Sequence, residues 1–453
     1  MLKKSEMIEL EIEKLVYGGE GLGKYDNFTI FVADTAPGDR IKAEIISVKK
    51  NYAQARLKEI IVPSQHRVKP FCPYAKACGG CQWQHIDYEE QLKIKKQIVE
   101  ESLKKFADLE IPVKNTLPAP ETREYRCKVQ LPVQQTAVSK RFLAGYYKKS
   151  THEIVNTKYC PVQPAALDEI TEFLRHKAQD FNLTAYDEKT KKGLIRHFVY
   201  RYSKSNKNFV LTIVINSDKI PENLVNYCKA VKENYINLEG IAVNFNTTQT
   251  NLIITDKSQV MEGKNFVIEE LGGKIFRISH DAFFQVNPSA ALQMFSEVKK
   301  MVMEKTNLPD ILDIYSGSGG FSVFLSDIAN KIIAVEENIS SIEDGKENIT
   351  LNNIKNIEYI KGNADIIIPK LLADKAKFDI IILDPPRKGC SEEVINAAAE
   401  ITDKFIIYIS CNPTTLARDI KILGENFKVI EVQPIDMFCY TYHVETILLA
   451  EKK

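Results

Sequence analysis

The stretch DILDIYSGSGGFSVFLSDIANKIIAVEEN, residues 310–338, decides the fold class. It contains two short apolar runs, and between them lie a glycine-rich turn and a helix-like segment. Further apolar runs, each separated from the next by a helix-like segment, follow as NIEYIKGNA, FDIIILDPP, KFIIYISCNP and FKVIEVQPIDM. Continuous apolar strands that alternate with helices are typical of a parallel sheet covered on both faces. Residues 271–453 are therefore predicted to form a doubly wound α/β domain, with HVETILLAEK as an antiparallel edge strand.

The chain of 453 residues is too long for one core, and two further domains are expected. Residues 1–62 contain short β-runs broken by glycine, aspartate and asparagine, which predicts a small, closed, OB-like barrel. Residues 63–270 combine a helical segment from Tyr88 to about Phe106 with strands such as NFVLTIVINS. We therefore predict a central α+β domain there, which can be discontinuous with respect to the C-terminal domain.

The composition is that of a soluble globular protein, with 44% hydrophobic and 27% charged residues. The sequence has neither a long uncharged apolar run nor a signal-peptide pattern, so we expect a cytoplasmic protein without a membrane span. Its 9 cysteines should then stay reduced, which favours metal binding or catalysis for clustered cysteines. The net charge is +1, and the basic segments fit solvated loops as well as an RNA-binding face. A monomer is the expected state.

Polar residues and glycines gather where the predicted parallel strands end, which is where doubly wound sheets bind ligands. Tyr315 and Gly317 lie in the first turn, Glu336 ends the second strand, and Asn363 and Asp384 follow the third and fourth. Glu336 lies about 20 residues after the glycines and is suited to bridge the two hydroxyls of a ribose. NAD would account for these features but leaves the Asp-Pro-Pro and Cys-Asn-Pro elements without a role. S-adenosylmethionine fits the pattern better.

Four cysteines have the spacing of a metal centre. Cys72, Cys78 and Cys81 lie close together in CPYAKACGGC, and Cys160 follows much later in YCPV. Four thiolates can hold an iron–sulfur cluster or a tetrahedral zinc ion. A structural disulfide is not expected in a reducing compartment. The chemistry of the residues alone leaves iron–sulfur and zinc open.

Five motifs, in order along the chain, make it similar to a known family. They are FFQVNP (283–288), DIYSGSGGFS, DPPRKG, YISCNPTTLARD and MFCYTYHVET. Together they resemble the RNA uracil-5-methyltransferase family, while residues 7–61 resemble a TRAM domain and the cysteine spacing is similar to that of the iron–sulfur members. The resemblance covers almost the whole chain and implies a Rossmann-like, S-adenosylmethionine-dependent methyltransferase domain. It also implies a [4Fe-4S] cluster, with zinc second, held by Cys72, Cys78, Cys81 and Cys160.

The resemblance assigns Cys411 as a nucleophile and Glu445 as a base. Carbon 5 of uracil is too weakly nucleophilic to take a methyl group unaided, and addition of a thiolate to carbon 6 turns the ring into a reactive enolate. A base must then remove the hydrogen from carbon 5 so that the thiolate can leave. From the residues alone, core packing for Cys411 and an edge-strand charge for Glu445 remain alternatives.

By the same resemblance, the cofactor and uracil pocket is lined by Gln285, Tyr315, Gly317, Glu336, Asn363 and Asp384. The target base must be flipped out or single-stranded to enter such a pocket. Phe283 and Phe284 are candidates for stacking on it, with core packing equally expected for one of them. Two residues depart from the family pattern, because Cys127 stands where asparagine is usual and Cys439 where proline is usual.

The RNA substrate is expected to be 23S ribosomal RNA, with transfer RNA as the alternative. An iron–sulfur RNA-binding protein without catalysis belongs to a different class, and it leaves the pair of Cys411 and Glu445 unused. An amino-methylating enzyme would explain the Asp-Pro-Pro element but neither Cys-Asn-Pro nor Glu445.

Overall fold

The N-terminal barrel is built from strands whose residues alternate between buried and exposed. The computed structural model describes residues 2–453, and its first five strands close in the order β1-β2-β3-β5-β4. They are β1 (Met7–Leu15), β2 (Gly21–Tyr25), β3 (Phe28–Val32), β4 (Arg40–Val48) and β5 (Tyr52–Val62). Ile8, Leu10 and Ile12 of β1 point into the barrel, because alternate residues of a strand face opposite sides. The predicted closed barrel is confirmed.

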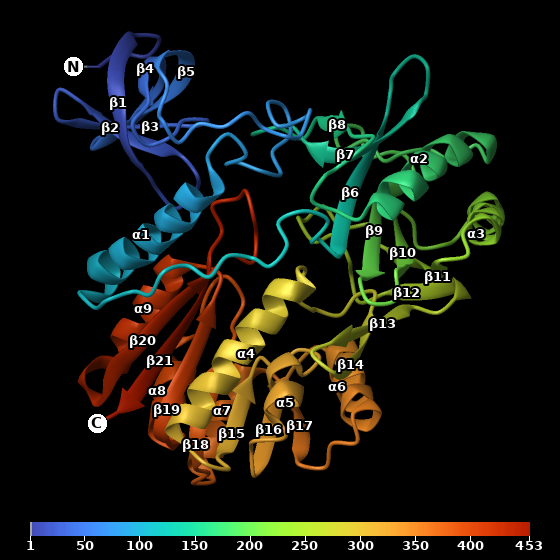
Figure 1. Cartoon of the computed structure of the whole chain (residues 1–453). Coiled ribbons are helices and arrows are strands. Elements are labelled where there is room, and N and C mark those ends of the chain that lie inside the picture. Colours follow the sequence, from blue (N-terminus) through green and yellow to red (C-terminus); the bar gives the residue numbers. More distant parts are fainter. Residues whose placement is uncertain (1) are drawn as a thin grey trace.

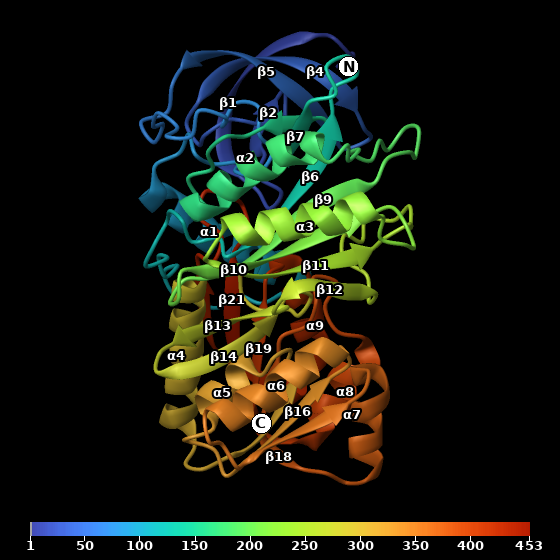
Figure 2. The ribbon, with the colours of Figure 1, turned by 90° about the vertical axis from the view of Figure 1, so that its right-hand side faces the viewer.

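The central sheet has seven strands in the order β12-β11-β10-β9-β6-β7-β8. They are β6 (Lys128–Gln135), β7 (Phe142–Tyr147), β8 (Ile154–Asn156), β9 (Ile195–Ser203), β10 (Asn208–Ile215), β11 (Leu238–Phe245) and β12 (Ser258–Gly263). Helices α2 (Ala165–Asp180) and α3 (Glu222–Asn234) pack on this sheet through one apolar cluster that includes Leu174 and Tyr227 (Figure 2). Strands and helices are therefore mixed here as predicted.

The C-terminal sheet also has seven strands, in the order β17-β16-β15-β18-β19-β21-β20. They are β15 (Asp310–Ile314), β16 (Lys331–Glu336), β17 (Ile357–Lys361), β18 (Phe378–Leu383), β19 (Thr402–Ser410), β20 (Phe427–Ile435) and β21 (Glu445–Lys452). Strands β15 to β19 are parallel, whereas β21 is antiparallel to both β19 and β20. The strand order reverses between β15 and β18, and ligands bind at such switch points.

The doubly wound architecture is confirmed, but one detail of the prediction is wrong. The HVETILLAEK run is antiparallel, as expected, yet it lies between β19 and β20 and is not an edge strand. The edge position belongs to β20, whose residues Lys428 and Ile430 remain partly or fully exposed. The nearly continuous burial of β21 fits its inner place in the sheet.

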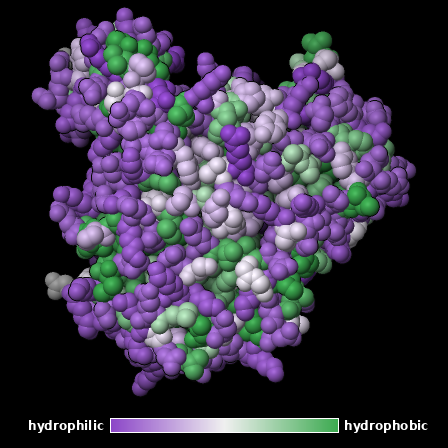
Figure 3. All heavy atoms as spheres, viewed as in Figure 1, coloured by the Kyte–Doolittle hydropathy of each residue, from purple (hydrophilic) through white to green (hydrophobic). Residues whose placement is uncertain are grey.

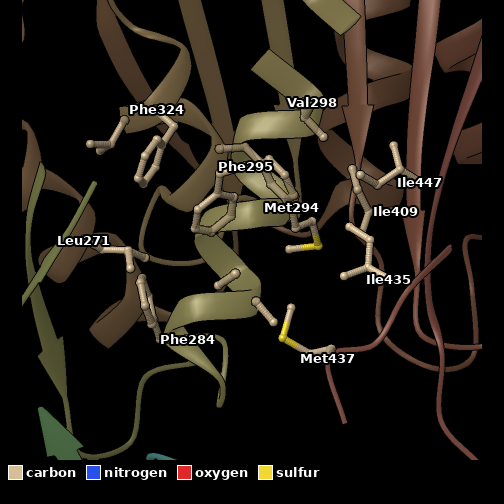
Figure 4. Close-up of a cluster of buried hydrophobic side chains, with 14 of the residues drawn as sticks. Leu271, Phe284, Met294, Phe295, Val298, Phe324, Ile409, Ile435, Met437 and Ile447 are labelled. Atoms are coloured by element: carbon tan, nitrogen blue, oxygen red, sulfur yellow. The ribbon is translucent and has the colours of Figure 1, made fainter. Parts of the chain in front are cut away.

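Helices cover both faces of the C-terminal sheet. On one face α4 (Pro288–Lys305) and α5 (Gly320–Leu325) pack on the strands, and Figure 4 shows Met294 on the side of Ile409 and Ile435, with Phe295 on the side of Phe324. The other face carries α7 (Ala364–Ala373), α8 (Glu392–Ile401) and α9 (Pro413–Leu423). Helix α6 (Ile339–Leu351) contacts β16 and β17. Burial on both sides explains why these strands read as continuous apolar runs.

Helix α1 (Tyr88–Ala107) belongs by its packing to the C-terminal sheet, although the sequence places it in the predicted central range 63–270 (Figure 1). It packs against α9, and Leu103 enters the apolar cluster beneath α8 and α9. After the helix, the Lys114 N–H donates to the Val432 carbonyl at 3.0 Å, so this segment lies beside the edge strand β20. The helical pattern was readable, but it does not specify which surface the apolar face covers.

A hairpin joins the central and C-terminal parts. Its strands are β13 (Phe266–Leu271) and β14 (Lys274–Ser279). β13 contacts β9 and β10 of the central sheet, whereas β14 contacts α6 of the C-terminal domain. The predicted boundary between residues 270 and 271 falls inside β13, so the hairpin is shared by both parts.

The face seen in Figure 1 is mainly hydrophilic, with apolar patches scattered over it (Figure 3). Basic and acidic residues are nearly balanced over the chain, 61 against 60. Within residues 2–453, no helix is both long and apolar enough to cross a membrane.

Candidate active site

Five predicted site residues end five parallel strands along one edge of the C-terminal sheet. Tyr315 follows β15, Glu336 is the last residue of β16, Asn363 follows β17 by two positions, Asp384 follows β18, and Cys411 follows β19. Because neighbouring parallel strands end at the same edge of a sheet, these five residues come together there. The sheet topology therefore brings these predicted cofactor residues and the predicted nucleophile to one edge of the sheet.

Glu445 reaches the same edge from the opposite direction. It is the first residue of antiparallel β21, and the register pairs Ser410 of β19 with Thr446 of β21. Cys411 comes directly after Ser410, and Glu445 comes directly before Thr446. Cys411 is partly exposed, whereas only 4% of Glu445 is accessible to solvent. The predicted nucleophile and base are thus neighbours across two adjoining strand ends.

Burial raises the pKa values of three acidic groups at this edge. Burial, followed by the nearby Glu445 and Asp384, raises the pKa of the Cys411 thiol to about 12. Burial and then Asp384 raise the pKa of Glu445 well above its ordinary value. Burial and then Asp313 raise the pKa of Asp384 to about 7. A crowded set of buried acids of this kind favours a cationic ligand, which would lower all of these pKa values.

Arg387 is a site residue that the sequence reasoning missed. Its guanidinium lowers the pKa of both Cys411 and Glu445, which places this cation beside the pair. Its backbone carbonyl accepts from Asn412 Nδ2 at 3.3 Å and from Thr415 Oγ1 at 3.5 Å, so the loop after β18 is tied to the start of α9. The available signal was a basic residue directly after Asp-Pro-Pro, at a sheet edge otherwise rich in acids.

The glycine-rich turn holds the Glu336 carboxylate in place. Gly317 has a φ of +55° and donates its N–H to Glu336 Oε2 at 2.9 Å. Oε1 of the same carboxylate accepts from the N–H groups of Glu337 and Asn338 at 2.9 and 2.8 Å. The carboxylate therefore has a fixed orientation at the end of β16, as a ribose-binding residue requires.

The other predicted pocket residues differ in what they contact. Asn363 caps α7 by accepting from the Asp365 N–H at 2.9 Å, and its Nδ2 donates to Glu337 Oε2 at 2.7 Å. Tyr315 has a φ of +65°. Burial, followed by the adjacent Cys390 thiol, raises the pKa of the Tyr315 phenol, so its hydroxyl lies near the loop before α8.

The segment FFQVNP lies against the glycine-rich turn. Ser318 Oγ donates to the Phe283 carbonyl at 3.3 Å. Gln285, two residues after Phe283, is buried. The two phenylalanines separate: Phe284 is 5% exposed and belongs to the core in Figure 4, whereas Phe283 is 59% exposed. Of the two candidates for stacking on a base, only Phe283 is therefore available.

The four predicted metal ligands surround one cavity of about 130 Å³. Cys72, Cys78, Cys81 and Cys160 all line it. Burial is the main cause that raises the pKa of Cys81 to about 11 and that of Cys160 to about 12, and the neighbouring thiols contribute to both. Among the residues the structure describes, no three His, Cys, Asp or Glu side chains meet closely enough to hold a single ion. Four thiols that line one cavity are the donor type that both an iron–sulfur cluster and a zinc ion use.

The two unusual cysteines lie elsewhere. Cys127 is buried, and among the charged groups near it are Glu269 and Arg201. Cys439 is fully buried in the core and lies 3.9 Å from Tyr88 Oη. Neither lines the cavity formed by the four predicted ligands.

Comparison with known families gives two matches along the chain. Residues 87–453 match the model of the tRNA (uracil-5-)-methyltransferase family, and residues 3–58 match the TRAM domain. An uncharacterized RNA methyltransferase of Clostridium tetani is 37% identical over 451 residues, which are 99% of this chain and 97% of the relative. Another of Clostridium acetobutylicum is 37% identical over 455 residues, covering 100% and 98%.

A solved structure matches over the full length. The Pyrococcus abyssi tRNA (uracil-54, C5)-methyltransferase in complex with S-adenosyl-L-homocysteine superposes with a TM-score of 0.76 at 25% identity, covering 98% of this chain and 100% of that one. The edge residues described above lie in the part that the family model matches. The chain belongs to the tRNA (uracil-5-)-methyltransferase family of S-adenosylmethionine-dependent RNA methyltransferases and carries an N-terminal TRAM domain.

Proposed function

We propose that this enzyme methylates carbon 5 of a uridine in RNA through a covalent bond between Cys411 and carbon 6 of the base. The observation that carries the proposal is the register of β19 and β21, which makes Cys411 and Glu445 neighbours at the ligand-binding edge. A nucleophile and a base within reach of one ring are what this reaction needs. The exposed Phe283 is available to stack on the flipped base.

The proposed steps conserve atoms and electrons. The Cys411 thiolate forms a bond to carbon 6, and the electrons of the double bond between carbons 5 and 6 move to the O4 oxygen as an enolate. The enolate electrons return to form a bond from carbon 5 to the methyl carbon of S-adenosylmethionine, and the sulfur keeps the electron pair of the broken S–CH3 bond and leaves as S-adenosylhomocysteine. Glu445 as carboxylate removes the hydrogen of carbon 5, the double bond re-forms, and the sulfur of Cys411 leaves.

The charges of the site support this order of events. In the unliganded protein burial and then the neighbouring Glu445 raise the pKa of Cys411, while burial and then Asp384 raise the pKa of Glu445, so both groups are held in their protonated forms. The cationic sulfonium, together with Arg387, would favour loss of these protons, because a nearby positive charge stabilises the anionic form. By this reasoning Gln285, Tyr315, Gly317, Glu336, Asn363 and Asp384 hold the methyl donor and the uracil.

The direct test is trapping with RNA that contains 5-fluorouridine, from which a base cannot remove the group at carbon 5. With S-adenosylmethionine, the protein should form a stable covalent adduct that maps to Cys411. Cys411→Ala should form none, while Cys439→Ala, the matched control, should form it normally. An adduct that persists in Cys411→Ala would overturn the proposal.

We propose 23S ribosomal RNA as the substrate, with transfer RNA as the second candidate. The second candidate has support from the likeness to the Pyrococcus abyssi enzyme, a tRNA (uracil-54, C5)-methyltransferase. Methyl transfer to purified ribosomal and transfer RNAs from cells that lack this gene separates the two. Labelling of only the transfer RNA would replace the first candidate by the second.

We also propose that Cys72, Cys78, Cys81 and Cys160 bind a [4Fe-4S] cluster. All four thiols line one cavity, and such a cluster needs four thiolates. Its role would be to tie residues 72–81 to the central domain at Cys160, since methyl transfer moves no electrons. Anaerobic reconstitution followed by iron and sulfide analysis tests the proposal, and Cys81→Ala should bind much less of both. Zinc without sulfide would contradict it.

A further inference from the structure

A loop of the N-terminal barrel reaches the catalytic edge of the C-terminal sheet. Tyr17, in the loop between β1 and β2, places its hydroxyl 3.4 Å from the backbone carbonyl oxygen of Cys411. Its ring packs edge-on against Tyr442, with centroids 5.4 Å apart and an interplanar angle of 88°. Tyr442 lies three residues before Glu445. One barrel side chain therefore contacts both segments that carry the proposed nucleophile and base.

The loop is held in this position from behind. The fully buried Trp83 donates its Nε1–H to the Gly19 carbonyl at 3.2 Å. Gly19 has a φ of +91°, and a Cβ atom there would lie 3.1 Å from the Tyr442 ring. Leu15 and Trp83 belong to one apolar cluster, against which both Tyr17 and Tyr442 pack. The barrel loop, helix α1 and the segment before Glu445 are thus packed as a unit.

The groups that face the Tyr17 hydroxyl are those of the proposed reaction. Burial raises the pKa of Tyr17 to about 12, and Cys411, Tyr442 and Glu445 add to the rise while Arg387 opposes it. The phenol is therefore neutral at physiological pH and can act as a donor. At 3.4 Å its hydrogen bond to the Cys411 carbonyl is long, so the packing of the ring contributes more than the bond itself.

We propose that Tyr17 is a positioning residue for methyl transfer. Through this side chain the barrel holds Cys411 and the segment 442–445 in their reactive arrangement, so the barrel contributes to the rate of the chemical step as well as to the binding of RNA. The inference rests on the function proposed above. It assigns a task to the YGGEG loop, which the motifs of the C-terminal domain leave unexplained.

The test compares Tyr17→Ala, Tyr17→Phe and the control Tyr52→Ala, which removes an exposed ring from β5 of the same barrel. The single-turnover rate is measured at saturating RNA and S-adenosylmethionine, where differences in RNA affinity no longer count. Tyr17→Ala should lower this rate by about 10- to 100-fold, because small displacements of reacting groups cost this much. Tyr17→Phe should restore most of the rate, and Tyr52→Ala should leave it unchanged. An unchanged rate in Tyr17→Ala would overturn the proposal.

A second readout does not depend on methyl transfer. Iodoacetamide alkylation of Cys411, followed by peptide mass spectrometry without RNA, reports how the thiol is held. Tyr17→Ala should alkylate Cys411 several-fold faster, because the ring no longer covers the thiol segment, while the buried Cys127 and Cys439 stay unmodified. Labelling of Cys127 or Cys439 would show general loosening, and an unchanged rate at Cys411 would contradict the inference. If the wild type failed to methylate RNA, the proposed function would fall, and this readout would still decide whether Tyr17 positions Cys411.

Discussion

Replacing Asp436 by asparagine should lower the free energy of unfolding by about 3 kcal/mol, because removing one charge of a buried ion pair leaves the other unpaired. Lys95 Nζ lies 2.5 Å from Asp436 Oδ1, and neither side chain is exposed. Tyr88 Oη donates to Asp436 Oδ2 at 2.7 Å, and Lys95 also donates to the Phe438 carbonyl at 3.2 Å. This network joins α1 to the segment that leads to Glu445.

The magnitude follows from what each substitution leaves behind. In Asp436→Asn the amide oxygen can still accept from Tyr88, so the loss is confined to the ion pair. In Asp436→Ala the Tyr88 hydroxyl also loses a charged acceptor, which adds about 1.5–3 kcal/mol. The double variant Lys95→Met/Asp436→Leu removes both charges, so its remaining cost should be mainly the lost acceptor of Tyr88, about 1.5–3 kcal/mol.

Urea unfolding followed by tryptophan fluorescence measures these changes. Trp83 is the single tryptophan of the chain, and Lys95 Nζ lies 6.0 Å from the centroid of its ring, so the signal reports this region. Lys104→Met is the matched control, because the ion pair of Lys104 with Glu110 is largely exposed and should leave the midpoint unchanged. The reasoning is refuted if Asp436→Asn costs no more than this control, or if the double variant is less stable than both single variants.

Three further predictions concern the site. Burial raises the pKa of Cys411, and the thiolate is the form that reacts with an alkylating agent. The alkylation rate of Cys411 in the free enzyme should therefore rise about tenfold per pH unit through pH 9. A plateau below pH 8 would contradict this. Arg387→Met should slow both alkylation of Cys411 and methyl transfer by about tenfold or more, with partial rescue by Arg387→Lys, because this cation stabilises the thiolate. Phe284→Ala should lower the free energy of unfolding by about 3–5 kcal/mol, because it opens a cavity in the core. Phe283→Ala should leave the stability in urea unchanged and slow methyl transfer. Equal losses of stability in the two variants would be inconsistent with their different burial.

The sequence predicted the C-terminal sheet well because its strands are buried on both faces. Runs such as FDIIIL of β18 contain almost no polar residues, so each strand stands out from the helices around it. The positions of Glu336 and Asp384 at the strand ends followed directly. The place of β21 between β19 and β20 could not be predicted in this way. The order of strands and helices along the chain is the same whether the last strand lies inside the sheet or at its edge.

Contacts between distant segments left no pattern in the sequence. Helix α1 shows an apolar stripe, but the stripe alone does not indicate that α9 and β20 are its partners. Tyr17 and Cys411 are 394 positions apart, and a contact between a loop and a strand end has no periodicity to detect. The role of Arg387 was missed for a related reason, since its effect on Cys411 depends on the spatial adjacency of two loops.

The most direct measurement of the central claim is the intact mass of Glu445→Gln after reaction with unmodified uridine RNA and S-adenosylmethionine. Without a base to remove the hydrogen of carbon 5, the enzyme should accumulate as a covalent complex with methylated RNA, joined through Cys411. Glu445→Gln/Cys411→Ala should remain free under the same conditions. Release of 5-methyluridine by Glu445→Gln at the wild-type rate, with no covalent species, would contradict the account.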